Sequence, residues 1–409
     1  MRTFSGGQIL RNGREIYFWV SAIMRRMAEE LQPAEEGLGW ISSWLPSWCP
    51  TSLSQLKDAE DKMLKAVKTP FSRQHVRISN GNYLWTLAFN LQPKEQSSLQ
   101  PHPPSLSEPA VPPRPCPPLV LLHGFGGGVG LWAQNLDSLC DRGAVYALDL
   151  LGFGRSSRPV FSTDPQAAEE EFLGALEEWR GRVGLEEMVL LGHNLGGYVA
   201  AAYTLAHPHR VKHLILVEPW GFPAHPESPD QEKSIPVWIR AMGAVLSPFN
   251  PLAGLRLAGP LGSEIHFVYE HFQFTGPMLV QTIRSDFKQK YSSVFDDNTV
   301  SNYIYHLNAQ MPSGETAFRN MTVPYCWAKR PMLDRIGLIQ PDIPISIIYG
   351  SRSSIDSDSG YTFRQTRPDV DIIVIRGAGH YVFADQPEDF NQTVLRILAG
   401  MGGADEGEA

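Results

Sequence analysis

Cysteine is scarce in this chain of 409 residues, and its four cysteines, Cys49, Cys116, Cys140 and Cys326, lie far apart. No Cys-x-x-Cys pair or Cys/His cluster is present, so we expect neither a disulfide scaffold nor a metal site. Positive charge is also limited, because 35 Lys and Arg stand against 43 Asp and Glu, which gives a formal net charge of −8. This balance argues against nucleic-acid binding, which requires a basic face for phosphates.

Long hydrophobic runs are missing as well. Residues 16–24 form the nearest candidate, but a membrane-spanning helix needs about 18 apolar residues. Two arginines and two glutamates follow this run almost at once, and no small-residue cleavage site of a signal peptide is present. We therefore interpret residues 1–39 as a disordered extension and expect a cytoplasmic protein, in keeping with the low cysteine content.

The first feature that stands out is a group of tryptophans, Trp40, Trp44 and Trp48, spaced by four residues. Tryptophan favours a lipid–water interface, where its ring lies in apolar surroundings while its N–H stays hydrated. Ser52 and Gln55 then form a capping box, which predicts a helix from residue 52 to about residue 67. We interpret residues 40–68 as a lipid-surface segment followed by a helix; the alternative is that the three rings pack on the globular domain.

Short valine, isoleucine and leucine runs alternate with helical patterns from residue 119 onward. Such runs are typical of strands that are buried on both faces of a parallel sheet. Their alternation with helices predicts an α/β fold with a mostly parallel, doubly wound sheet. The predicted strands are 83–89, 119–122, 144–148, 188–191, 214–217, 345–349 and 372–375, and the clearest helices are 165–183 and 197–206.

Two segments interrupt this pattern. Residues 91–118 hold ten prolines and predict a loop inserted into the first half of the core, 69–221. More than a hundred residues without strand runs separate Val217 from Ile345, so we interpret 222–344 as a helical cap over the carboxyl ends of the strands. The second half of the core is then 345–397, and 398–409 is predicted to be a disordered tail.

Several motifs follow the predicted strands in a fixed order. Gly192-His193-Asn194-Leu195-Gly196 comes after one strand and has the form of the Gly-x-Ser-x-Gly elbow of α/β-hydrolases. His123 to Gly126 is similar to their oxyanion loop, which implies that Phe125 and Leu195 supply oxyanion-hole N–H groups. Asp356 and His380 follow the last two strands, so nucleophile, acid and histidine have the chain order of this family. The chain therefore resembles the α/β-hydrolases.

Asn194 departs from the hydrolase pattern, because the elbow residue is normally serine. A carboxamide has no proton that histidine can remove to make a nucleophile, and loss of the nucleophile costs about 10⁶ in rate in a triad enzyme. We therefore expect the degenerate triad Asn194, Asp356 and His380 to lack serine-hydrolase activity. We also expect the Asn194 side chain to hydrogen-bond His380, since a buried histidine needs a partner.

The residue sequences of these motifs are similar to those of one small branch of α/β-hydrolases. This branch comprises the abhydrolase-domain lysophosphatidic acid acyltransferases that also co-activate adipose triglyceride lipase on lipid droplets, whereas a sister branch of phospholipid hydrolases keeps serine at the elbow. The resemblance implies acylation of lysophosphatidic acid to phosphatidic acid, with acyl-CoA as co-substrate and no bound cofactor. It also implies contacts with adipose triglyceride lipase and with a perilipin-type coat protein on the droplet surface. The matching segments are 44–52, 123–132, 150–159, 191–197, 217–223, 312–318 and 377–387.

The same resemblance assigns acyl transfer to a His-x-x-x-x-Asp motif, here His380 and Asp385, with His380 as general base and Asp385 orienting it. The alternative is that Asp385 caps the following helix. Whether Asp356 or Asp385 pairs with His380 stays open at this point. Arg352 and Gly379 are the expected contacts for the lipase partner. For Arg352 the alternatives are a docked phosphate and a solvated loop charge. The departures from the branch are the first 39 residues, the proline-rich loop and residues 263–278.

Overall fold

The computed structural model describes residues 50–91, 116–223, 252, 255–256, 276–323, 327–353 and 357–402. All of these residues belong to one compact unit, Cys49–Ala409. Several features expected from the sequence lie outside the described residues. They are the extension 1–39, the tryptophans Trp40, Trp44 and Trp48, most of the proline-rich loop, residues 263–275, the acid Asp356 and the end of the tail.

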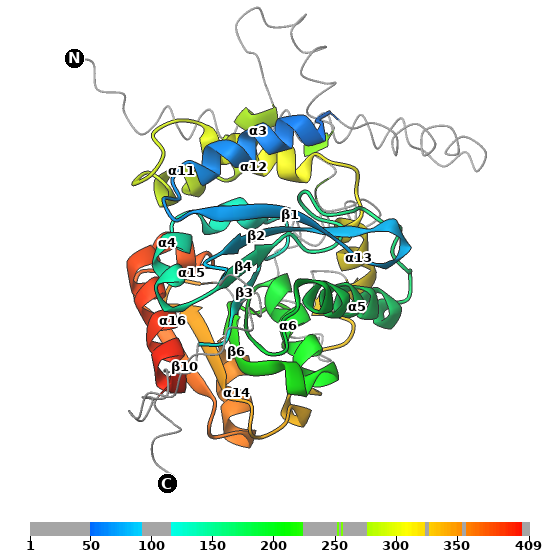
Figure 1. Cartoon of the computed structure of the whole chain (residues 1–409), viewed down its shortest axis with the longest axis vertical. Helices are drawn as coiled ribbons and strands as arrows, with labels where there is room; N and C mark the ends of the chain where they lie inside the picture. Colours follow the sequence, from blue (N-terminus) through cyan, green and yellow to red (C-terminus); the bar gives the residue numbers. More distant parts are fainter. Residues whose placement is uncertain are drawn as a thin grey trace, which may run out of the picture. The chain divides into compact units, whose positions relative to one another are not determined.

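Within the described residues, eight strands form one sheet in the order β1-β2-β4-β3-β5-β6-β9-β10 (Figure 1). Within this sheet β3, β4, β5, β6, β9 and β10 pair in parallel, and β2 is antiparallel to both β1 and β4. The α/β class with a mostly parallel sheet is thereby confirmed. The strands are β1 (Phe71–Arg77), β2 (Tyr83–Phe89), β3 (Leu119–Leu122), β4 (Val145–Leu148), β5 (Met188–His193), β6 (Val211–Val217), β9 (Ile345–Gly350) and β10 (Asp371–Ile375).

The strand β1 is one that the hydrophobic pattern does not predict. Its sequence, Phe-Ser-Arg-Gln-His-Val-Arg, is mostly polar, and only Val76 is buried. It lies at the edge of the sheet, where one neighbour supplies its hydrogen bonds. Pairing with β2, and not burial of its side chains, therefore determines this strand.

The two faces of the sheet carry separate hydrophobic cores. Alternate residues of β3 divide between them, with Val120 and Leu122 in one core and Leu119 and Leu121 in the other. The helices α5 (Pro165–Val183), α6 (Leu195–Ala206) and α14 (Asp358–Thr366) contribute to the first core. The second contains residues of α3 (Leu53–Leu64), α4 (Leu136–Leu139), α12 (Thr299–Asn308), α15 (Val382–Asp385) and α16 (Pro387–Gly402).

Capping residues determine where the predicted helices begin and end. The Asp164 side chain accepts a hydrogen bond from the Ala167 N–H at 2.8 Å, Pro165 occupies the first helical position, and Gly184 ends α5 with φ 77°. The capping box of Ser52 and Gln55 is present at the start of α3. The helix predictions for residues 165–183 and for the segment after Ser52 are thus confirmed.

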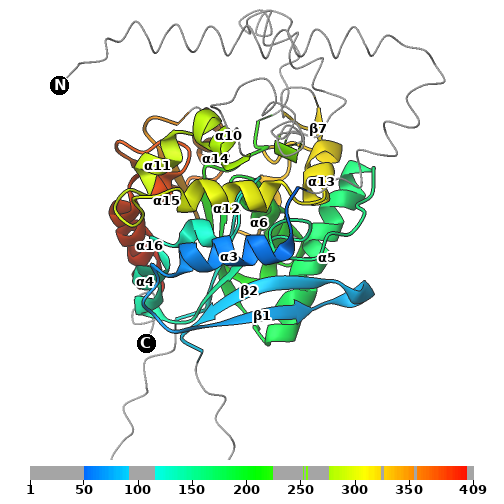
Figure 2. The same ribbon diagram turned by 90° about the horizontal axis from the view of Figure 1, so that it is seen from above.

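The inserted segment between β6 and β9 is helical in its described part, with one small hairpin that the sequence did not predict. Figure 2 shows α12 beside α3, and the two helices are in contact. None of the described helices combines the length and the hydrophobicity that are needed to cross a bilayer. The segment contains α10 (Gly276–Ile283), α11 (Asp286–Lys290), α12, α13 (Gly314–Met321) and the hairpin strands β7 (Thr322–Val323) and β8 (Trp327–Ala328).

Candidate active site

The elbow that the sequence predicted lies between β5 and α6. Asn194 occupies its tip with φ 51° and ψ −113°, a strained conformation for a residue with a side chain. Glycines make the turn possible, because a Cβ at Gly192 would lie 2.2 Å from the Gly196 carbonyl oxygen, and a Cβ at Gly196 would lie 2.5 Å from the carbonyl oxygens of Leu122 and His123, at the end of β3. The chain thus keeps the backbone geometry of a nucleophile elbow although the nucleophile itself is absent.

The Asn194 side chain turns toward the loop after β3. Its Oδ1 accepts a hydrogen bond from the Phe125 backbone N–H at 3.3 Å. Phe125 N–H is one of the two groups expected to form the oxyanion hole; the other, the amide of Leu195, belongs to the first residue of α6. The amide oxygen of Asn194 therefore occupies a donor that would otherwise stabilise developing negative charge. The expected hydrogen bond from Asn194 to His380 is not among those of the described residues.

His380 lies on the loop after β10, and its only ion-pair partner in the described part of the chain is Glu218. Its Nδ1 is 3.5 Å from Glu218 Oε2. The same Nδ1 is buried and has no hydrogen-bond partner among the described residues, whereas 27% of the side chain is exposed. Because Nδ1 is covered, the exposed part of the ring comprises its other atoms. The sequence analysis did not single out Glu218.

Glu218 directly follows β6, the neighbour of the elbow strand β5, and is completely buried. Its Oε1 accepts a hydrogen bond from the Gly350 N–H at 2.6 Å, and its Oε2 accepts a short one from the Ser353 hydroxyl. Its backbone has φ 48°, a left-handed conformation that costs on the order of 1–3 kcal/mol in a residue other than glycine. A charged residue directly after a strand that is buried at every position except Lys212 was the available sequence signal.

Asp385 binds other groups than those expected. Its Oδ2 accepts a hydrogen bond from the Gly379 N–H at 2.9 Å, and its Oδ1 forms a short ion pair with Lys290 of α11. In the part of the chain that the structure describes, its carboxylate neither pairs with His380 nor caps α16. Asp385 therefore fixes the turn that precedes His380 and ties that turn to the inserted segment. This corrects the expectation that Asp385 faces the imidazole.

Two further histidines lie buried beneath the site in the neutral form. Burial, together with the nearby His380, holds the pKa of His193 well below its usual value, and its Nε2 lies 3.0 Å from the His380 carbonyl oxygen. Burial also lowers the pKa of His123. The His123 Nε2 accepts the Leu150 N–H at 3.0 Å, so its Nδ1 donates to the Gly124 carbonyl at 2.8 Å. Both rings act as fixed supports for the elbow and the oxyanion loop.

The helix α12 of the inserted segment forms hydrogen bonds with the oxyanion loop and with the residues that follow it. Asn308 donates from its amide to the Gly126 carbonyl at 2.9 Å, and the hydroxyl of Tyr303 accepts the Gly130 N–H at 3.0 Å. In the same last turn of α12, Nδ1 of His306 lies 2.7 Å from the Thr51 hydroxyl. The start of the described chain, the cap and the site are therefore joined through one helix.

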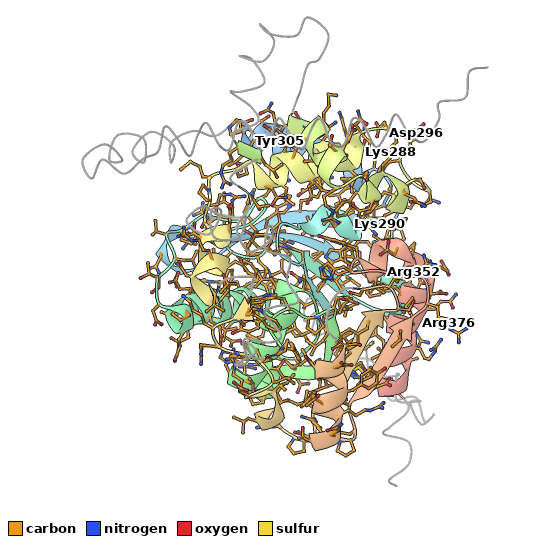
Figure 3. All side chains as sticks on the ribbon, turned by 180° about the vertical axis from the view of Figure 1, so that it is seen from behind. Lys288, Lys290, Asp296, Tyr305, Arg352 and Arg376 are labelled. Atoms are coloured by element: carbon orange, nitrogen blue, oxygen red, sulfur yellow. The ribbon has the colours of Figure 1, made fainter. Side chains whose placement is uncertain are left out.

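The predicted partner residues lie at the surface near this site. Figure 3 shows Arg352 and Arg376 on the same side of the molecule, below Lys290. Both arginines are exposed, and neither forms an ion pair within the described ranges. The Arg352 N–H donates to the Ala378 carbonyl at 2.8 Å, next to Gly379, so the two predicted contacts are neighbours. No cluster of three metal-ligating side chains occurs among the residues that the structure covers.

Comparisons with known proteins agree with this geometry. The family model described as alpha/beta hydrolase fold matches residues 117–387. The chain is 56% identical over 373 residues to human 1-acylglycerol-3-phosphate O-acyltransferase ABHD5, covering 90% of this chain and 97% of that protein. It is 46% identical over 373 residues to the bovine (lyso)-N-acylphosphatidylethanolamine lipase, covering 91% and 98%.

A solved structure supports the fold alone. The carboxylesterase CesB of Bacillus subtilis has a TM-score of 0.56 at 18% identity, covering 85% of this chain and 98% of that chain. The sheet order, the elbow at Asn194 and the family match all point the same way, and the resemblance inferred from the motifs is confirmed. The chain belongs to the α/β-hydrolase fold family.

Proposed function

We propose that the protein regulates triacylglycerol storage at the lipid-droplet surface by activating a triacylglycerol lipase, and that it does not hydrolyse esters through its elbow. Asn194 carries this proposal. Its carboxamide cannot replace a serine hydroxyl as a nucleophile, and its oxygen occupies the Phe125 N–H. The rest of the elbow is kept, with its strain and its close glycine contacts. Such a site fits a protein that acts on a partner through its surface.

The tryptophan segment supports the lipid-surface part of the proposal. Trp40, Trp44 and Trp48 supply large rings with a polar edge, which suits the boundary between a phospholipid monolayer and water. The chain that follows them is anchored, because Thr51 contacts α12 and Ser52 caps α3. Docking would thus hold the folded domain close to the droplet in the cytoplasm, where a perilipin-type coat protein is the second expected partner.

Arg352 and Gly379 are the proposed contacts for adipose triglyceride lipase. Arg352 is exposed, and its backbone donates to the residue before Gly379, so both sit on adjoining loops at one edge of the sheet. The nearby Arg376 adds a second exposed cation on this side (Figure 3). An acidic surface on the lipase would complement this pair of guanidinium groups.

Acyl transfer is the second candidate function, favoured by the relatives that are named 1-acylglycerol-3-phosphate O-acyltransferase. His380 would remove the proton of the lysophosphatidic acid hydroxyl as that oxygen attacks the thioester carbon of acyl-CoA. A new C–O ester bond forms, the C–S bond breaks, and the CoA sulfur takes the proton back. The products are phosphatidic acid and CoA, and no covalent intermediate on Asn194 is required.

The regulatory function is tested by adding the purified protein to a triacylglycerol lipase acting on emulsified triolein. We expect several-fold stimulation by the wild type, loss of stimulation in Arg352→Ala, and full stimulation in Lys288→Ala, a matched exposed cation on α11. Absence of any stimulation by the wild type would overturn the proposal. Equal stimulation by Arg352→Ala would remove this arginine from the contact.

The acyltransferase function needs a separate assay. Purified protein free of bacterial acyltransferase is incubated with labelled oleoyl-CoA and lysophosphatidic acid, and phosphatidic acid is measured. We expect product with the wild type and none with His380→Ala. Absence of product would overturn the acyltransferase proposal and leave regulation as the one proposed function. Equal rates in both proteins would overturn the role of His380 as the general base.

A further inference from the structure

One of the two ring nitrogens of His380 lacks a hydrogen-bond partner among the described residues. Nδ1 is buried, and no hydrogen bond to it exists among the described residues. A buried ring nitrogen without a partner is rare in folded proteins, because it loses its hydration without compensation. The group that faces it is the carboxylate of Glu218, at 3.5 Å. A small approach of the two side chains closes this contact into a hydrogen bond.

Glu218 is held for this contact from the opposite side. The Gly350 N–H and the Ser353 hydroxyl both donate to its carboxylate, on Oε1 and Oε2 respectively. A carboxylate that accepts two such bonds is held in one orientation. Since the side chain is fully buried, the imidazole is its natural remaining partner.

The backbone conformation of Glu218 is a second, independent observation that supports a specific role for this residue. Four residues other than glycine have positive φ in the described chain, and two of these are Asn80 and Asn90, of a type that tolerates this conformation. The remaining two are Asn194 and Glu218. Glutamate does not favour it, so the fold maintains a strained backbone where it places this carboxylate against His380.

Asp385, the predicted acid whose position the structure describes, already has other partners. Asp385 accepts from the Gly379 N–H and pairs with Lys290. We infer that Glu218, which directly follows β6, is the positioning residue that holds a proton on Nδ1 of His380 and thereby leaves Nε2 unprotonated. This is the arrangement in which a histidine works as a general base on a bound hydroxyl.

The inference concerns the tautomer of His380, and only its consequence for acyl transfer rests on the proposed function. The test is a long-range ¹H–¹⁵N correlation spectrum of the full chain, recorded where the imidazole is neutral and assigned with His380→Gln. We expect the wild type to carry the proton on Nδ1. In Glu218→Gln, which preserves size and can still accept the Gly350 N–H, we expect the population to move toward Nε2–H.

Asp385→Asn serves as the matched control and is expected to keep the wild-type tautomer, because the Asp385 carboxylate binds the Gly379 N–H and Lys290. If the acyl-transfer assay gives product, Glu218→Gln should also lower kcat tenfold or more at nearly constant KM. An Nε2–H tautomer in the wild type would overturn the inference without any variant. A Glu218→Gln spectrum that matches the wild type would overturn it equally, whatever the acyltransferase assay shows.

Discussion

The Oδ1 atom of Asn194 lies 3.3 Å from the Phe125 backbone nitrogen and accepts its N–H. In a hydrolase this N–H points at the oxygen of a tetrahedral intermediate. Here the elbow residue itself fills that position, so the substitution of serine by asparagine removes the nucleophile and also occupies part of the oxyanion hole. The two effects together explain why ester hydrolysis is not expected, although the fold is preserved.

Gly124 tests how closely the oxyanion loop must approach the elbow. A Cβ at this position would lie 2.6 Å from His193 Nδ1 and 2.8 Å from Asn194 Cβ, and His193 is buried. We expect Gly124→Ala to lower the free energy of unfolding by about 1–3 kcal/mol, measured by urea denaturation. Gly174→Ala, at an exposed position of α5 with open space, is the control and should not destabilise the protein. A neutral Gly124→Ala would contradict the geometry.

Asp385 and Lys290 should be coupled, because their ion pair is mostly covered, with side-chain exposures of 13% and 14%. A double-mutant cycle with Asp385→Asn and Lys290→Met should give a coupling energy of roughly 1 kcal/mol in thermal or urea unfolding. The amide of Asp385→Asn still has an oxygen for the Gly379 N–H, so the turn should survive. Strictly additive effects would show that the pair does not hold the cap to the His380 turn.

The buried carboxyl of Glu60 should make the free energy of unfolding depend on pH. Burial, and then the nearby Asp149, raise the pKa of this carboxyl to about 8, against the ordinary value of 4.5. Between these two values the folded chain binds a proton that the unfolded chain has released, so the free energy of unfolding decreases as pH rises from about 5 to 8. The expected loss is on the order of a few kcal/mol.

The measurement for Glu60 is urea unfolding at several pH values for the wild type and Glu60→Gln. The glutamine keeps an oxygen for Trp85 Nε1, which donates to Glu60 at 3.0 Å, and for Arg155, which pairs with it at 2.8 Å. We expect the wild type to lose more stability than the variant across this window. Parallel curves for the two proteins would disprove the role of Glu60.

The tryptophan segment makes a prediction about location. Substitution of Trp40, Trp44 and Trp48 by alanine removes three interfacial rings, so we expect binding to artificial droplets to fall at least about tenfold in a flotation assay. Leu338→Ala, which removes a leucine that is 79% exposed, is the control and should bind like the wild type. Full droplet association of the triple variant would mean that another surface docks.

Much of the fold could be predicted from residue patterns, because buried parallel strands leave unmistakable runs such as Leu119–Leu122 and Ile345–Gly350. The edge strand β1 could not be predicted in this way, because its residues are mostly polar and it forms by pairing with β2. The elbow and His380 were predictable from their motifs, as their spacing to strands is fixed by the fold. These features depend on local sequence.

The partner of His380 depends on tertiary geometry and was missed. Sequence order directed attention to Asp385 and to Asp356, which lies outside the described residues. Among the described residues, the carboxylate next to the ring comes from the end of β6, through a left-handed backbone at Glu218. A positive φ leaves no reliable mark on a glutamate in the sequence. The contact of Asn194 with Phe125 was missed for a related reason, since a carboxamide has several partners within reach at a crowded turn.

The central claim is that a carboxamide, and no reactive hydroxyl, stands at the tip of the elbow between β5 and α6. The most direct measurement is the intact mass of the purified chain after incubation with a fluorophosphonate, which forms a covalent adduct with activated serines. We expect the mass to remain that of the unmodified protein, while a serine esterase treated in parallel is fully labelled. One adduct per chain, mapped to a serine at this site, would contradict the account.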